Sequence, residues 1–316
     1  MTATEHPYDV EATRNAADRA PDAGLLTGTA PAGEEGSRVR RVALTGAAGS
    51  LGSDVAPGLL ELGYELVCID RRAPEHPAGA TWVRASVNDR PALAEAMAGC
   101  DAVVHLAGIP QEDDWEPIMT ANIDGTQAVL ETANRLGVRR AVLASSIHAA
   151  GFVPVPPDGE RVPDDVVIRP NTFYGVTKAA VEALGSLYHD RYGMDVICLR
   201  IASRQARPTD TRMLSTWLSP ADAVRLLDAA LSPAATGFRT VWGVSANARS
   251  YLSPDGGAAI GFRPVDDAEA WAAELLAART EPPAGSTDWN ASFIGGVFCS
   301  PEPPRYAPPT ADGQVR

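Results

Sequence analysis

From residue 38 onward, short apolar runs alternate with longer segments in which apolar residues recur every three or four positions. Short apolar runs are typical of buried strands, and the longer periodic segments are typical of helices. This alternation predicts an α/β fold with a parallel sheet that is covered by helices on both faces. The predicted strands are 39–45, 65–70, 81–85, 102–106, 140–145, 195–201 and 238–243. The predicted helices are 50–62, 91–98, 115–136, a helix that carries Tyr174 and Lys178, a helix opened by Ser219 and Pro220, and 266–278.

Composition narrows the class of protein. The 316 residues carry a net charge of −13, which argues against nucleic acid or an anionic membrane as a partner. No apolar stretch approaches the length of about 18 residues that a membrane span needs, and the first residues do not form a secretory signal. The four cysteines are scattered without metal-binding spacing, so we expect buried free thiols and no metal. These features predict a cytoplasmic protein.

A glycine-rich turn follows the first predicted strand and opens the first helix. Its glycines are Gly46, Gly49 and Gly52, in the spacing G-x-x-G-x-x-G. A turn in this position brings backbone N–H groups and a helix N-terminus toward a dinucleotide pyrophosphate. The strand–turn–helix context therefore favours a dinucleotide cofactor.

An acidic residue ends the second predicted strand. Asp70 comes 18 positions after Gly52. A carboxylate at this place can hold both ribose hydroxyls of NAD and repels the 2′-phosphate of NADP. Arg71 and Arg72 follow directly and could accommodate a phosphate. We favour NAD because the acid occupies the strand end itself.

A phenol and an ammonium lie one helical turn apart at Tyr174 and Lys178. Lowering a tyrosine pKa from about 10 to about 7 requires roughly 4 kcal/mol. One positive charge at about 4 Å supplies about that much at an effective dielectric constant of 20. The pair therefore predicts a phenolate that acts as a general base.

Together these motifs resemble the extended short-chain dehydrogenase/reductase superfamily, which also has a serine at the position of Ser145-Ser146. The resemblance implies that Tyr174 is the acid/base, that Lys178 lowers its pKa and binds the nicotinamide ribose, and that Ser146 steadies the substrate oxygen. It also implies NAD as cofactor. The residues expected to contact it are Gly46, Ala48, Gly49, Ser50, Leu51, Gly52, Asp70, Arg71, Ser86, Val87, Leu106, Ala107, Gly108, Asn122, Ala144, Tyr174, Lys178 and Ile201.

Further runs resemble the bacterial uronate dehydrogenases, above all Arg-Met-Leu-Ser-Thr-Trp at 212–217 and Gly-Gly-Val-Phe at 295–298. This resemblance implies oxidation of the anomeric hydroxyl of galacturonate, glucuronate or a related carboxylated sugar to an aldarolactone, with Arg212 clamping the carboxylate. The residues expected to contact the substrate are Pro110, Ser146, Ile147, His148, Tyr174, Ser203 and Arg212.

Three positions depart from the pattern of those enzymes. Pro110 stands where a hydroxyl residue is usual, Ile147 where asparagine is usual, and Ser86 where many relatives have aspartate. If Pro110 and Ile147 face the sugar, two hydrogen bonds to it are absent, and such changes can alter substrate choice strongly.

The predicted organisation is a Rossmann-like doubly wound sheet with a small C-terminal substrate lobe. Residues 1–37 are predicted to be a disordered acidic extension, 38–203 the NAD-binding core, 204–300 mainly the substrate lobe, and 301–316 a Pro-rich tail. We also expect a homo-oligomer. Two other functions remain open: a sugar-nucleotide epimerase or dehydratase on the same fold, and a regulator that senses NAD without chemistry.

Overall fold

The strands predicted from apolar runs pair in one sheet. The computed structural model describes residues 39–73, 79–279, 283 and 285–305; the predicted N-terminal extension and residues 306–316 of the predicted tail lie outside this part of the chain. The sheet has seven parallel strands in the order β3-β2-β1-β4-β5-β6-β9. The bounds are β1 Arg41–Thr45, β2 Glu65–Asp70, β3 Thr81–Arg84, β4 Ala102–His105, β5 Arg140–Ser146, β6 Asp195–Ile201 and β9 Phe238–Gly243.

Strand order reverses direction at β1, so the switch point lies between β1 and β4. Thr45 of β1 is paired with His105 of β4, and Ser146 of β5 with Ile201 of β6, so these strands end together. In parallel α/β sheets the crevice at such a switch point, beyond the carboxyl ends of the strands, is the usual place of a ligand.

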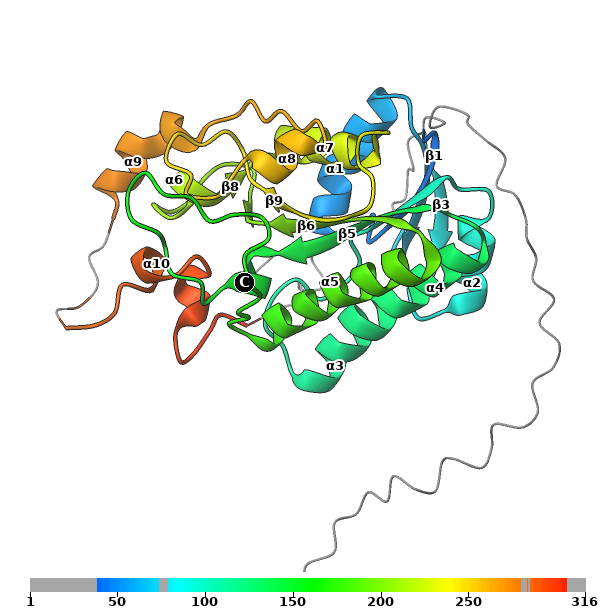
Figure 1. The fold of residues 1–316 in the computed structure, drawn as a ribbon, viewed down its shortest axis with the longest axis horizontal. Helices are drawn as coiled ribbons and strands as arrows, with labels where there is room; N and C mark the ends of the chain where they lie inside the picture. Colours follow the sequence, from blue (N-terminus) through cyan, green and yellow to red (C-terminus); the bar gives the residue numbers. More distant parts are fainter. Residues whose placement is uncertain (1–38, 74–78, 280–282, 284, 306–316) are drawn as a thin grey trace, which may run out of the picture. The chain divides into compact units, whose positions relative to one another are not determined.

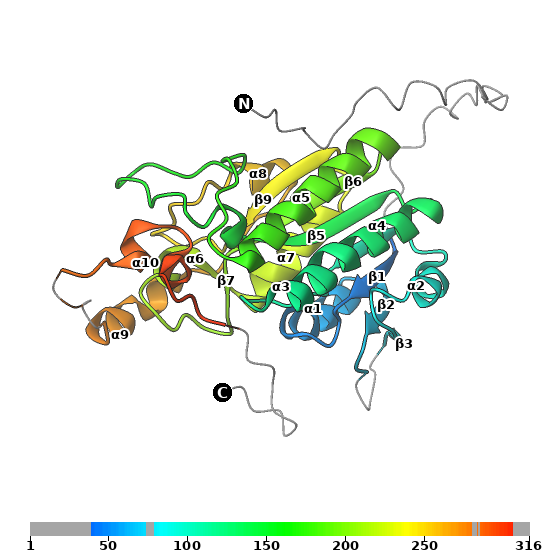
Figure 2. The same ribbon diagram turned by 90° about the horizontal axis from the view of Figure 1, so that it is seen from below.

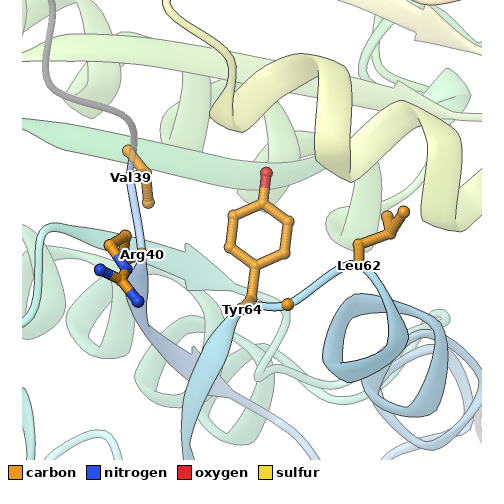
Figure 3. A pocket seen from close by; sticks show the side chains of 5 residues that line it. Val39, Arg40, Leu62 and Tyr64 are labelled. Atoms are coloured by element: carbon orange, nitrogen blue, oxygen red, sulfur yellow. The ribbon is translucent and has the colours of Figure 1, made fainter.

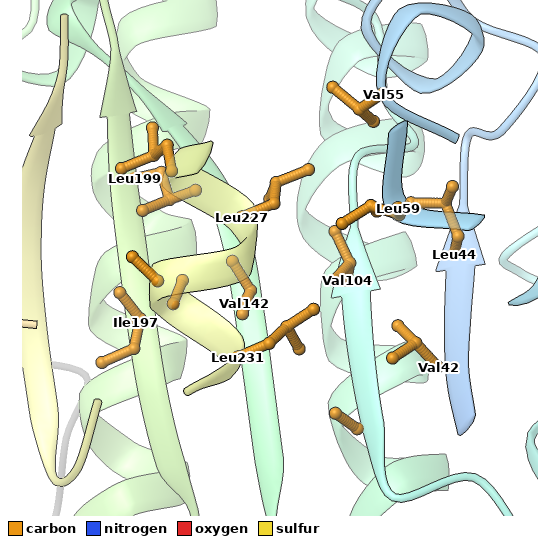
Figure 4. Close-up of a cluster of buried hydrophobic side chains, with 14 of the residues drawn as sticks. Val42, Leu44, Val55, Leu59, Val104, Val142, Ile197, Leu199, Leu227 and Leu231 are labelled. Carbon is orange, nitrogen blue, oxygen red and sulfur yellow. The ribbon is translucent and has the colours of Figure 1, made fainter. Parts of the chain in front are cut away.

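Helices cover both faces of the sheet (Figures 1 and 2). One layer contains α1 Ser50–Glu61 and α7 Pro220–Leu231, and the other contains α2 Arg90–Met97, α4 Gly125–Arg135 and α5 Phe173–Tyr192. Leu44, Leu59 and Leu227 pack in the core beneath the first layer (Figure 4). Ala43 faces the second core, because neighbouring strand residues point to opposite sides of a sheet.

Capping residues define the ends of the functional helices. Thr172 accepts a hydrogen bond from the backbone N–H of Gly175 over 2.9 Å and begins α5. Gly193 ends that helix in the left-handed conformation with φ 67°. Ser219 caps α7 by accepting from Asp222 over 2.9 Å, and Pro220 follows it, as predicted.

Two predicted helices are less regular than their apolar periodicity indicates. The predicted helix 115–136 is α3 Trp115–Met119, a π-helical turn Thr120–Asp124 and then α4. The predicted helix 266–278 begins as a 3₁₀ turn at Ala268–Trp271, where Asp267 caps Glu269, and continues as α9 Ala272–Ala277. Periodicity located both segments but does not distinguish α from π or 3₁₀ turns.

Short elements after Ser203 were not predicted individually. They are β7 Ser203–Arg204, α6 Met213–Thr216, β8 Trp217–Leu218, α8 Asp255–Ala259 and α10 Trp289–Ser292, with 3₁₀ turns at Ile147–Ala150 and Gly296–Cys299. Leu214 and Trp217 pack against Trp271 and Leu275 in a small separate cluster. The strand predicted at 238–243 does return to the sheet as β9, whereas the lobe boundary near residue 203 stays a prediction, since the chain from Arg38 forms one compact unit.

Candidate active site

The glycine turn holds the N-terminus of α1 against the end of β4. Gly46 has φ 72°, and a Cβ there would lie 2.6 Å from the backbone nitrogen of Ala107. A Cβ on Gly52 would lie 2.3 Å from the carbonyl oxygen of Gly46. Only glycine fits at these two positions, so the turn is a backbone cradle at the switch point, and its geometry suits a bound pyrophosphate.

Asp70 lies beside this turn. Its Oδ2 accepts from the backbone N–H of Ala48 over 3.1 Å, and its Oδ1 accepts from that of Arg72 over 3.0 Å. The Arg72 guanidinium donates to the carbonyl of Ala48 over 3.2 Å. The turn therefore carries a carboxylate and an arginine side by side at the place where an adenosine ribose would be recognised.

Asn122 fastens the loop after β4 to α5. Its Oδ1 accepts from the backbone N–H of Ile109 over 2.7 Å, while its Nδ2 donates to the carbonyl of Ile109 over 3.1 Å and to Thr177 Oγ1 over 2.9 Å. These bonds use the Asn122 amide to position the loop, and its predicted contact with the cofactor stays a prediction. Asn122 lies in the π-helical turn, and such turns are frequent at functional sites.

Tyr174 and Lys178 project from the first turns of α5, and both side chains are buried. The Lys178 ammonium lies 5.4 Å from the centre of the Tyr174 ring and donates to the carbonyl of Ala144 over 2.8 Å. Lys178 is the only lysine in the chain. Ala144, expected near the cofactor, thus fixes the ammonium beside the phenol.

Burial changes the predicted acidity of this pair. It raises the pKa of Tyr174 to about 12, and a hydrogen bond with Ser146 lowers that pKa only in part. Burial also lowers the pKa of Lys178 to about 8. These side chains alone therefore do not give the predicted phenolate at neutral pH. The four-residue spacing indicates a nearby ammonium, but it does not indicate the burial that raises the pKa of the phenol.

The two serines at the end of β5 have different partners. Ser145 donates to Glu182 over 2.6 Å, and Glu182 forms a buried ion pair with Arg200 over 2.9 Å. Ser146 is the next residue of the strand, so it points to the opposite side of the sheet, and it lowers the pKa of the Tyr174 phenol. Ser146, and not Ser145, therefore influences the Tyr174 phenol, and its role toward the substrate stays a prediction.

His148 extends the site beyond Tyr174. Its ring lies 5.8 Å from that of Tyr174 and 4.6 Å from that of Phe298, between ring centres. Its Nδ1 lies 3.2 Å from Asn171 Oδ1, an atom that only accepts, so Nδ1 donates and Nε2 is left as an acceptor. Burial and the charge of Arg212 lower the pKa of His148 to about 3, so the ring is neutral.

Arg212 lies near His148, since its charge lowers the pKa of the imidazole. Its Nη1 donates to Ser203 Oγ over 3.0 Å, and its Nη2 donates to the carbonyl of Ile294. Its Nε is buried without a partner among the described residues. Gly296 packs directly on this side chain, because a Cβ there would lie 2.7 Å from Arg212 Nε. The segment around the Gly-Gly-Val-Phe motif therefore holds the guanidinium in place.

The two residues that depart from the family pattern lie in different surroundings. Pro110 is exposed at the loop after β4. Ile147 is 2% exposed and packs in an apolar cluster with Trp242, Val244 and Ile294. The Ile147 side chain therefore belongs to an apolar wall behind the site.

Several residues near the site carried no role in the sequence-based hypothesis. Glu112 accepts from the backbone N–H of Tyr174 over 2.9 Å, Asn171 orients His148, and Phe298 packs against His148 with the two ring planes tilted by 56°. The Tyr251 hydroxyl is buried near Arg212. Phe298 belongs to a motif that the resemblance had pointed out, whereas no spacing or motif indicates Glu112, Asn171 or Tyr251.

Other features lie away from this crevice. A pocket lined by Val39, Arg40, Leu62, Gly63 and Tyr64 lies at the amino-terminal side of β1, opposite the strand ends that form the site (Figure 3). Within the described residues, no group of His, Cys, Asp and Glu side chains could hold a metal ion, and no helix is long and apolar enough to cross a membrane.

The fold and these motifs define a family. Residues 42–252 match the model of the NAD dependent epimerase/dehydratase family, and the chain belongs to this family. It is 36% identical to the uronate dehydrogenase of Agrobacterium fabrum over 261 residues, which cover 82% of this chain and 97% of that protein. It is 34% identical over 249 residues to the NAD-dependent glucose-6-phosphate dehydrogenase of Haloferax volcanii, covering 72% and 93%.

A solved structure shows the same architecture. The crystal structure of a mutant uronate dehydrogenase from Agrobacterium tumefaciens, complexed with NAD, superposes with a TM-score of 0.76 at 34% identity, covering 84% of this chain and 99% of that one. The predicted doubly wound fold and the resemblance are thereby confirmed.

Proposed function

We propose that this protein is an NAD-dependent dehydrogenase that oxidises the anomeric hydroxyl of a hexuronate to an aldarolactone. The observation that carries this proposal is that His148 is close to both Tyr174 and Arg212. Its ring lies 5.8 Å from the Tyr174 ring, and the charge of Arg212 lowers its pKa, so a proton acceptor and an anion-binding group lie near the same imidazole. A sugar with a carboxylate at one end and a reactive hydroxyl at the other matches these two groups.

The cofactor site fits NAD. The backbone of the Gly46–Gly52 turn would hold the pyrophosphate, since its close packing leaves no room for side chains there. Asp70 would hold the adenosine ribose, and Lys178 the nicotinamide ribose. When bound, NAD accepts a hydride from the sugar C1 carbon.

Side chains of the protein would accept the proton of the sugar hydroxyl. Ser146 lowers the pKa of the Tyr174 phenol and would hold the reacting oxygen of the sugar, so that the hydroxyl proton points toward the phenol oxygen. Tyr174 takes that proton as the C–H electron pair leaves C1, and a C1=O bond forms. The ammonium of Lys178 favours the phenolate electrostatically, against the opposing effect of burial.

Arg212 and His148 would orient the substrate. Arg212 offers several donors to a carboxylate, in a planar arrangement suited to two oxygens. The neutral His148 offers Nε2 as an acceptor to a ring hydroxyl, because Asn171 occupies its Nδ1. Together these groups would fix which end of the sugar approaches Tyr174.

The test is a substrate panel. Galacturonate or glucuronate added with NAD should produce reduced nicotinamide, which is followed by its absorbance, whereas glucose 6-phosphate and neutral aldoses should be poor substrates. Tyr174→Phe should lower turnover by about 10²–10⁴-fold and leave NAD binding nearly unchanged. Absence of turnover with both uronates, together with oxidation of another sugar, would refute the proposed substrate.

A further inference from the structure

Two buried side-chain atoms in the described part of the chain lack a hydrogen-bond partner: Arg212 Nε and the Tyr251 hydroxyl. A buried donor without a partner costs about 1–3 kcal/mol, and most buried polar groups are therefore paired. Such an atom calls for an explanation. A ligand that supplies the missing acceptors would be one.

The two atoms belong to neighbouring side chains. Burial raises the pKa of Tyr251, and the charge of Arg212 is the next largest influence and lowers it. The guanidinium also directs a donor toward the phenol oxygen, although no pair of their atoms reaches normal hydrogen-bond geometry. A phenol that faces a guanidinium keeps its own proton for another acceptor, since an arginine accepts no hydrogen bond.

Tyr251 packs against the apolar wall behind the site. Its ring packs against the apolar cluster that contains Ile147 and Ile294. The carbonyl of Ile294 accepts from Arg212, and Ile147 directly precedes His148 in the site. Because Ile147 has no polar side-chain atom, the Tyr251 hydroxyl is a hydrogen-bond donor in an otherwise apolar part of this wall.

We propose that Tyr251 is a specificity-determining residue that donates its hydroxyl proton to the substrate carboxylate held by Arg212. This inference rests on the proposed function and names a second recognition group for the acidic end of the sugar. A carboxylate has two oxygens with several acceptor positions, enough for both a guanidinium and a phenol. A neutral hydroxymethyl group in the same place would leave the cation of Arg212 without a counter-charge. An unpaired buried charge is unfavourable, so the free energy of binding a neutral sugar would be less favourable.

The variant Tyr251→Phe removes only the oxygen atom. We expect kcat/KM for galacturonate or glucuronate to fall about tenfold or more, mainly through KM, because hydrogen bonds to charged groups are among the stronger ones. The kcat/KM for the corresponding neutral aldose and the KM for NAD should stay unchanged. The melting temperature without sugar should stay the same or rise, because an unpaired buried hydroxyl is removed.

Tyr188→Phe is the matched control. The Tyr188 hydroxyl donates to Glu131 over 3.0 Å in the second helical layer, so the preference for acid over neutral sugar should not change in this variant.

Binding is measured separately from turnover. Galacturonate should raise the melting temperature of the wild-type protein saturated with reduced NAD, and it should do so less in Tyr251→Phe. If the wild-type protein turns over uronates and Tyr251→Phe keeps the same preference for acid over neutral sugars, the proposed role of Tyr251 is overturned. The proposed function is then left intact. Uronate binding that depends on Tyr251, without turnover, would support the subsite and reject the proposed reaction. No binding of acid sugars to the wild-type protein would overturn both.

Discussion

Glu112 accepts a hydrogen bond from the backbone N–H of Tyr174 over 2.9 Å, across 62 positions of sequence. Its carboxylate thus lies at the N-terminus of α5, where the unpaired N–H groups of the helix favour a negative charge. We expect Glu112→Ala to lower kcat about tenfold, because the first turn of α5 positions the phenol. Glu112→Gln keeps an acceptor oxygen and should retain most of the activity. Steady-state kinetics should show the loss in kcat with an unchanged KM for NAD; equal activity of both variants and the wild type would contradict this positioning role.

Gly52 is the position in the cofactor turn with the least room. A Cβ there would lie 2.3 Å from Gly46 oxygen and 2.7 Å from Ala47 Cα, both backbone atoms. We expect Gly52→Ala to displace the turn and weaken NAD binding by at least about tenfold, measured by calorimetric titration. Gly193→Ala is the control, since it has φ 67° with open space around it. It should lower stability by about 1 kcal/mol without changing the affinity for NAD.

We expect Asp70 and Arg72 to influence the choice between NAD and NADP in opposite directions, because they carry opposite charges beside the same turn. Replacing Asp70 by asparagine removes the charge that would repel a 2′-phosphate and leaves Arg72 beside the turn. We expect Asp70→Asn to shift the ratio of kcat/KM values for NAD and NADP toward NADP by roughly tenfold to a hundredfold. Adding Arg72→Ala should reverse part of that shift. An unchanged ratio in Asp70→Asn would show that another group selects the cofactor.

Local patterns predicted the sheet well and the polar contacts poorly. The strands 65–70, 195–201 and 238–243 were predicted with their observed bounds, because apolar residues occupy most of their buried positions. The glycine turn was predicted from the spacing of its glycines, which lie within a few residues of one another. Glu112 and Tyr251 were missed because their partners lie far away in sequence. The periodicity of apolar residues does not indicate contacts that a loop makes with a distant segment.

The acidity of Tyr174 and Lys178 was also beyond what local sequence patterns predict. Four-residue spacing predicts that Lys178 lies near Tyr174, and the structure places it there. The pKa of the phenol, however, is raised by burial, which depends on side chains contributed by many segments. Likewise Ile147, expected to face the sugar, is covered by Trp242 and Ile294, which come from the other half of the chain.

The single lysine allows the last prediction to be measured directly. Burial lowers the pKa of Lys178 from 10.5 to about 8. Between these values the unfolded chain binds a proton that the folded chain does not, so the free energy of unfolding should increase as pH rises from about 8 to 10.5. Below pH 8 the cost of burying the ammonium is fully present, at about 3 kcal/mol.

We expect Lys178→Met to be more stable than the wild type at pH 7 by up to that amount. Its free energy of unfolding should no longer increase between pH 8 and 10.5, and it should lose turnover. Urea unfolding at several pH values without added nucleotide tests this, and lysine labelled with ¹³C should give one titrating ε-carbon signal in the folded protein. A signal that titrates near 10.5 would show that the ammonium is solvated and would contradict the buried arrangement.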